Sequence, residues 1–114
     1  MPFINVKTSI AVSDAKESAL FKSLGKAIEN IPGKSEAWLM LNIEGGCHMC
    51  FQGDAVTPCA MVDVRIFGAA DSKAYENMTE AVCSIFESEL NIPADRVYIC
   101  YKGYSEWGWN SQNF

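Results

Sequence analysis

The chain begins Met1-Pro2-Phe3, and this start makes Pro2 a candidate general base. A small second residue favours removal of the initiator methionine, which would leave Pro2 with a free secondary amine at the start of a strand. A reference α-amine has a pKa near 8, so only about 10% of it is neutral at pH 7. Burial or a nearby lysine lowers this pKa, and a drop of about two units would make the amine mostly neutral. Proline is also common after methionine, so the dipeptide alone does not establish a base.

Lys34 and the C-terminal segment 107–114 are candidates for binding groups. Lys34 follows the helix stop Pro32-Gly33, at the turn into an expected strand. If that turn lies at the same sheet end as Pro2, the ammonium would lower the amine pKa and bind a carboxylate or enolate oxygen. Otherwise Lys34 is a solvated loop lysine. The segment 107–114 is too aromatic for a disordered chain end, so it either packs an interface or lines a pocket.

Cys47-His48-Met49-Cys50 is a C-x-x-C pattern with an internal histidine. Redox pairs of this type usually open a helix, whose N-terminus lowers the thiol pKa, but no helix is expected here. Zinc needs four ligands, and neither a second cysteine pair at a suitable spacing nor a second histidine is present. The five cysteines are an odd number, so we expect mostly reduced thiols in a cytosol-like compartment and no metal site.

Length and composition limit the fold and the partners. The chain has 114 residues, 49% hydrophobic and 20% charged, which is enough for a single domain over residues 1–114 with a real core. A net charge of −5 without a basic face argues against a nucleic-acid partner. No apolar run reaches the roughly 18 residues of a membrane span, and no signal-peptide pattern is present. We therefore expect a cytoplasmic protein that does not interact with membranes.

The first half of the chain is expected to form a strand–helix–strand unit. Apolar and polar residues alternate over 3–10, which predicts a strand. Asp14 and Glu17 resemble a capping box, and apolar residues then recur at helical spacing as far as Pro32. The short apolar run 37–43 predicts a strand that is covered on both faces.

The second half repeats this pattern. A strand is expected around 62–67, a helix over 72–90 and a strand over 96–101. Both helices end at the same tripeptide, Asn30-Ile31-Pro32 and Asn91-Ile92-Pro93. The repeat predicts two βαβ units related by pseudo-two-fold symmetry.

These elements imply an α+β fold, with a four-stranded mixed sheet and two helices on one face. The segments 45–59 and 101–114 would form loops with extra short edge strands. The strands look too apolar to leave the second sheet face in water, and no helix remains to cover it. We therefore expect an oligomer.

Taken together, these features resemble the macrophage migration inhibitory factor family of the tautomerase superfamily. The resemblance covers essentially the whole chain, and it rests on Met1-Pro2-Phe3, Gly33-Lys34, Pro58-Cys59-Ala60, Asp95-Arg96-Val97-Tyr98-Ile99 and Gly108-Trp109-Asn110. It implies a homotrimer whose sheets enclose a central channel. It also implies a keto–enol tautomerase of small aromatic 2-oxo acids such as phenylpyruvate, with dopachrome-type compounds as further candidates and no cofactor.

The resemblance also assigns the site. Pro2 would be the base, Lys34 would bind the substrate carboxylate, and the backbone amide of Phe67 would contact the substrate. A neighbouring subunit would supply a tyrosine and an aromatic C-terminal segment, which correspond to Tyr98, Trp109 and Phe114. The remaining expected pocket residues are Trp38, Cys100 and Trp107.

Four departures from the family pattern are visible. Cys100 stands where asparagine is usual, so a polar contact to the substrate ring is weakened or lost. Phe67 and Trp107 are bulkier than usual and narrow the pocket. Mammalian members carry a C-x-x-C where this chain has Cys59-Ala60-Met61-Val62, so a thiol-redox activity based on that motif is doubtful.

Three other functions remain open at this point. The first is a cytokine-like protein that binds a receptor, is exported without a signal peptide and has a vestigial pocket. Hydration or dehalogenation of small unsaturated acids would need an arginine pair near Pro2, but neither Arg65 nor Arg96 is clearly placed for it. A thiol oxidoreductase would use Cys47 and Cys50.

Overall fold

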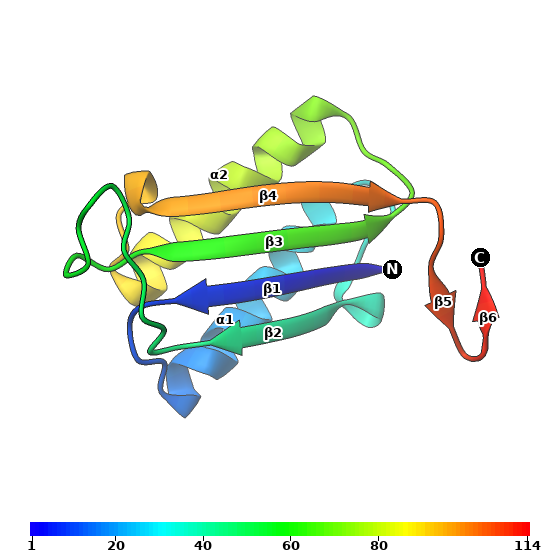
Figure 1. Ribbon diagram of the computed structural model, residues 1–114. Helices are drawn as coiled ribbons and strands as arrows, with labels where there is room; N and C mark the ends of the chain where they lie inside the picture. Colours follow the sequence, from blue (N-terminus) through cyan, green and yellow to red (C-terminus); the bar gives the residue numbers. More distant parts are fainter.

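A four-stranded sheet covered by two helices on one face forms the body of the molecule (Figure 1), which the computed structural model describes for all 114 residues. The elements are β1 (Pro2–Thr8), α1 (Asp14–Ala27), η1 (Ile28–Asn30), η2 (Glu36–Trp38), β2 (Met40–Glu44), β3 (Ala60–Phe67), α2 (Ser72–Leu90), η3 (Ala94–Arg96), β4 (Val97–Tyr104), β5 (Gly108–Trp109) and β6 (Gln112–Asn113).

The sheet has the strand order β2-β1-β3-β4. The outer pairs, β1 with β2 and β3 with β4, are parallel, whereas the central strands β1 and β3 are antiparallel. Each half of the chain is therefore a βαβ unit, and the two units are related by a pseudo-two-fold axis between β1 and β3. The predicted α+β fold is confirmed. β5 and β6 form a separate short ribbon beyond the end of the sheet (Figure 1).

The core lies between the sheet and the helices. Every second residue of β1 and β3 is buried on the helix side, as the period of two in a strand requires. From α2, the buried side chains follow each other at helical spacing, so that they form one face. The fully buried residues include Ile4, Val6, Leu20, Leu24, Val62, Val64, Met78, Val82 and Phe86.

The helix ends differ from the predicted ones. The N-cap of α1 is Ser13, whose hydroxyl accepts the Lys16 N–H at 3.2 Å, so the predicted capping box of Asp14 and Glu17 is wrong. α1 tightens into η1 before Pro32 is reached. α2 begins after the N-cap Asp71 and ends at Asn91 in the left-handed conformation. The repeated Asn-Ile-Pro therefore ends the two helices by different geometries.

Several strand boundaries also differ. The predicted strand over 37–43 begins only at Met40, because residues 36–38 form the helical turn η2, which the Leu39 N–H closes by bonding the Glu36 carbonyl at 3.2 Å. β2 is an edge strand whose residues alternate between exposed and half-buried, so it is not covered on both faces. Arg96 lies in η3 before β4, and β1 ends at Thr8 instead of residue 10.

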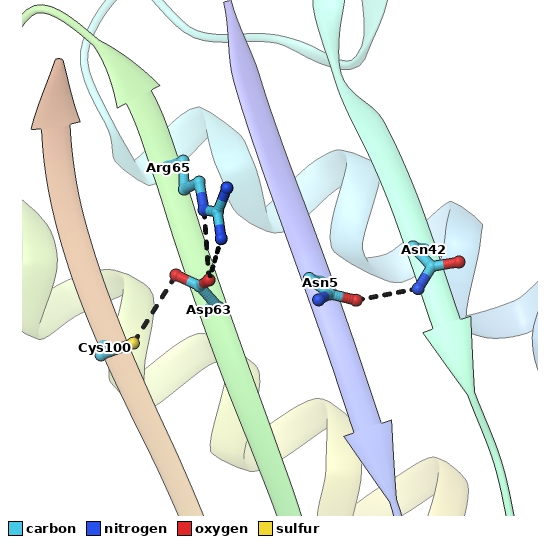
Figure 2. A network of polar contacts seen from close by, with 5 residues as sticks. All are labelled: Asn5, Asn42, Asp63, Arg65 and Cys100. Atoms are coloured by element: carbon cyan, nitrogen blue, oxygen red, sulfur yellow. Dashed lines mark hydrogen bonds and ion pairs between the residues drawn. The ribbon is translucent and has the colours of Figure 1, made fainter.

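The sheet face opposite the helices, here called the helix-free face, is more polar than predicted. One polar row crosses all four strands (Figure 2), in the order Asn42, Asn5, Asp63 and Cys100. The Asn42 amide donates to Asn5 Oδ1 at 2.8 Å, and the Cys100 thiol donates to Asp63 Oδ1 at 3.6 Å. Arg65 donates twice to Asp63 Oδ2. The same face also exposes Met40 and Tyr98, at 68% and 62%, so it is mixed and not uniformly apolar as expected.

No helix of the protein is long and apolar enough to cross a lipid bilayer.

Replacing Phe86 with alanine tests the position of the core. Phe86 is 0% exposed, so Phe86→Ala should lower the free energy of unfolding by about 3–5 kcal/mol. Phe21→Ala is the matched control, because Phe21 is 38% exposed on α1 and its loss should cost far less. Urea denaturation of both variants at one protein concentration measures the difference. Equal losses would contradict the placement of the core.

Candidate functional site

Pro2 is held rigidly at one end of the sheet. It is buried at the start of β1 and lies in register with Ile66 of β3. The residue before it is also fixed, because the Met1 carbonyl accepts the Phe67 N–H at 2.9 Å. The N-terminus is therefore packed against the end of β3.

Lys34 reaches the same end of the sheet. Its ammonium donates to the Phe67 carbonyl at 2.8 Å. The pKa of the Met1 amino group is lowered, first by burial and then by the charge of Lys34 and a hydrogen bond with it. Gly33 adopts a φ of +79°, which side chains with a Cβ rarely allow, and so makes the turn that directs Lys34 there. The turn thus lies at the Pro2 end of the sheet, which is the condition under which Lys34 can lower the amine pKa.

A hollow of about 390 Å³ opens beside Pro2. Its lining is mostly apolar and includes Trp38 and Leu39 from the chain around η2, and Trp107 and Trp109 from the C-terminal segment. This volume lies within the range of small-ligand pockets, roughly 300–1,000 Å³. An apolar wall of this kind disfavours a cation, which is the environment that a neutral amine needs.

A glycine in α1 allows η2 to approach closely. A Cβ at Gly25 would lie 2.6 Å from the Glu36 carboxylate and 3.2 Å from the Glu36 Cβ. A larger residue would therefore displace the Glu36 carboxylate and crowd the Glu36 Cβ. Since Trp38 ends η2, this close approach helps to place the indole at the hollow.

The aromatic residues of the C-terminal segment form a continuous series beside the hollow. Trp38 meets Trp109 edge-on with ring centroids 5.1 Å apart, and Trp109 stacks with Phe114 at 6.4 Å. Phe114 in turn lies 5.3 Å from Phe67. All of these contacts occur within one chain. The resemblance implied that a neighbouring subunit supplies Trp109 and Phe114, whereas within this chain the β5–β6 ribbon folds back toward its own N-terminus (Figure 1).

Two predicted pocket residues lie away from Pro2 within the chain. Tyr98 is in register with Met61, near the opposite end of β3 from Ile66. Cys100 lies on the helix-free face, where burial and then the charge of Asp63 raise the pKa of its thiol. Tyr98 can thus reach a site beside Pro2 only from another subunit.

The sequence analysis missed six lining residues, among them Ala37, Leu39 and Met40 in the segment 37–40. The apolar run 37–43 indicated a continuous strand there, so residues near its start were not considered as parts of a pocket. The signal that was available is Ser35-Glu36, a polar pair able to begin a helical turn before the strand.

The C-x-x-C segment belongs to the other end of the sheet. Cys47, His48 and Cys50 line a separate hollow of about 460 Å³ together with Ser9 and Pro58. All five cysteines are free, and no three His, Cys, Asp or Glu side chains lie close enough together to hold a metal ion.

Known proteins resemble this chain along its whole length. The family model described as macrophage migration inhibitory factor matches residues 1–113. The macrophage migration inhibitory factor of Xenopus laevis is 30% identical over 116 residues, which cover 100% of this chain and 99% of that protein. The Brugia malayi homolog is 28% identical over 99 residues, covering 87% of this chain and 84% of that protein.

Solved structures show the same arrangement of elements. Leishmania major MIF2 superposes with a TM-score of 0.92 at 30% identity, covering 100% of this chain and 97% of that one. The Prochlorococcus marinus homologue superposes with a TM-score of 0.86 at 33% identity, covering 98% of both chains. Since the match extends from the βαβ repeat through the proline-bearing end of the sheet, the chain belongs to the macrophage migration inhibitory factor family, which covers tautomerase and cytokine-like roles.

Proposed function

We propose that this protein is a keto–enol tautomerase of small aromatic 2-oxo acids, phenylpyruvate and dopachrome-type compounds among them. The observation that supports this most strongly is the meeting of Pro2, Lys34 and an aromatic hollow at one end of the sheet. A base, a cation for a carboxylate and an apolar wall for a ring are the groups that such a reaction requires.

Removal of Met1 would create the base. The Pro2 nitrogen would then be the terminal amine, and burial and the charge of Lys34 already lower the pKa of the amine one residue earlier. Pro2 is itself buried, so the same causes would act on its nitrogen. A secondary amine that is neutral near pH 7 can remove the proton from the carbon beside the 2-oxo group.

Removal of Met1 would also free a donor for the substrate. The Phe67 N–H now donates to the Met1 carbonyl at 2.9 Å, and the Lys34 ammonium lies 2.8 Å from the Phe67 carbonyl. A substrate oxygen that replaced the Met1 carbonyl would accept from this N–H, next to the Lys34 charge. Lys34 would hold the carboxylate, and both groups would stabilise the dienolate. The protonated Pro2 would then return the proton to a different atom, so one base suffices.

The aromatic side chains would hold the substrate ring. Trp38, Trp109 and Phe114 are 51%, 50% and 53% exposed, so a flat ring could bury surface that water now covers. Each well-placed aromatic contact contributes roughly 0.5–1.5 kcal/mol beyond its buried area.

The proposal includes a homotrimer. Tyr98, 62% exposed at the far end of the sheet, would enter the pocket of a neighbouring subunit. Cys100, two residues further along β4, lies beside Asp63 and would provide at most a weak donor near that pocket.

A cytokine-like protein that binds a receptor is the second candidate. The names of the curated relatives favour it, because they describe an effect on macrophages and not a reaction. Partner binding that survives when the hollow beside Pro2 is blocked, together with no turnover of 2-oxo acids, would support this role over the enzymatic one.

Pro2→Gly tests the base. Its kcat/KM for phenylpyruvate enolisation should fall about 10²- to 10⁴-fold, the usual contribution of a general base. Intact mass must first show that Met1 is absent from the wild-type protein. A form that keeps Met1 is the control and should be inactive, since its Pro2 nitrogen is an amide. Substantial activity in either protein would remove Pro2 from the mechanism.

Lys34→Met tests the role of the cation through the pH dependence. Lys34 lowers the amine pKa, so its loss should raise that pKa and move the acid limb of kcat/KM to higher pH. KM should rise roughly tenfold, because a charge-assisted hydrogen bond to the carboxylate is lost. Lys73→Met is the control, since Lys73 contacts only Glu76 among the acidic residues, on the surface of α2. An unshifted acid limb would contradict the assigned role.

A further inference from the structure

Arg96 is the one charged residue that the fold buries. It is 7% exposed, and Thr8 is the only other buried polar residue. The three ion pairs of the chain involve other side chains, so no carboxylate neutralises Arg96 within ion-pair distance. A buried charge without a counter-ion is costly unless hydrogen bonds replace the lost water. The contacts of its guanidinium therefore indicate why it is there.

The guanidinium binds the backbone of a single loop. It donates to the carbonyls of Phe51 at 2.8 Å, Asp54 at 3.2 Å, Thr57 at 2.8 Å and Pro58 at 3.3 Å. This segment, the 51–58 loop, lies at the end of the sheet opposite the N-terminus (Figure 1). A planar fork of donors is needed to reach four carbonyls at once, and lysine cannot reproduce it.

The loop has little other support. Phe51 and Asp54 exchange two backbone hydrogen bonds, each 3.0 Å long. Asp54 Oδ1 accepts the N–H groups of Val56 and Thr57 at 2.8 and 3.0 Å. A hydrogen bond from the Thr57 side chain, followed by those from these two N–H groups, lowers the pKa of Asp54 to about 2. All of these bonds are local, so Arg96 is the group that ties the loop to the start of β4.

The same guanidinium connects the loop to an aromatic pair. Its carbon lies 5.0 Å from the centroid of the Phe51 ring, a cation–π distance. The Phe51 ring then meets Tyr98 with centroids 4.6 Å apart and planes at 69°. Tyr98 is 62% exposed, so few side chains pack against its ring. Phe51 is a principal one among them.

We propose that Arg96 is a positioning residue for Tyr98: by ordering the 51–58 loop it places the Phe51 ring, which holds the Tyr98 ring in one orientation. The inference rests on the proposed function, in which Tyr98 closes the substrate pocket of a neighbouring subunit. Arg96 and Phe51 do not touch the substrate. Their effect is on how well the pocket binds it, because a mobile Tyr98 must be ordered each time a substrate enters.

Arg96→Lys and Phe51→Leu test this positioning role through kinetics. Each should raise KM for phenylpyruvate about three- to tenfold, the value of an aromatic contact, and change kcat less than about twofold. The acid limb should not move, because neither variant alters Lys34 or the residues that bury the N-terminal amine within its own chain. The double variant should have the same KM as the single ones, because both changes interrupt the same series of contacts from Arg96 through Phe51 to Tyr98. Arg65→Lys, at the exposed arginine that bonds Asp63, is the control and should leave KM unchanged.

A second measurement does not depend on turnover. Hydrogen exchange measures how well ordered the amides of the 51–58 loop are, and NMR reports the surroundings of the Tyr98 ring. Both are recorded on the protein without substrate. In Arg96→Lys the loop amides should exchange faster and the Tyr98 signals should shift, while Phe51→Leu should shift the Tyr98 signals alone.

The two measurements separate the possible failures. An inactive wild-type protein with the expected NMR changes would overturn the proposed function and support the placement of Tyr98 by Arg96. An active wild-type protein whose Tyr98 signals do not respond to Arg96→Lys, or whose KM does not respond to Phe51→Leu, would overturn the inference.

Discussion

The register in which β1 pairs with its two neighbours determines the candidate site. Pro2 lies opposite Ile66 of β3, and Phe3 lies opposite Met40 of β2. The start of β1, the end of β3 and the turn before β2 therefore meet at one end of the sheet, where Lys34 bonds the backbone of β3. A slip of one residue would turn Pro2 from the helix side to the helix-free face. The site thus depends first on long-range strand pairing, and the local Gly33 turn then directs Lys34 to it.

The alternation along the strands divides the sheet into two chemically different faces. On the helix side it forms the apolar core, which holds the strands in register. On the helix-free face it produces the polar row that includes Asn5 and Asp63 (Figure 2). Pro2 lies where the buried face reaches the end of the sheet, so its surroundings are apolar although a cation is near. This combination disfavours a protonated amine.

The two ends of the sheet hold different parts of the proposed pocket. Pro2 and Lys34 are at one end, whereas Tyr98, supported by Phe51 and Arg96, is near the other. In a closed ring of identical subunits with head-to-tail contacts, one end of each subunit meets the opposite end of the next. Pro2 and Tyr98 are far apart within one chain. In the proposed trimer, each pocket therefore combines Pro2 and Lys34 of one subunit with Tyr98 of the next.

The sequence by itself determined the elements and the candidate residues. Periods of two and of about 3.6 identified β3 and α2, because these patterns depend on neighbouring residues. The ordered set of short motifs from Met1-Pro2-Phe3 to Gly108-Trp109-Asn110 indicated the family. Only the tertiary structure decided that Trp38 ends a helical turn, that Trp109 and Phe114 pack against Trp38 and Phe67 of their own chain, and that a polar row crosses the helix-free face (Figure 2). It also decided that Arg96 binds the backbone of a loop some 40 residues earlier, at the carbonyls of Phe51 and Thr57. Such contacts depend on strand register and turn geometry, which join distant segments and leave no periodic signal in the sequence.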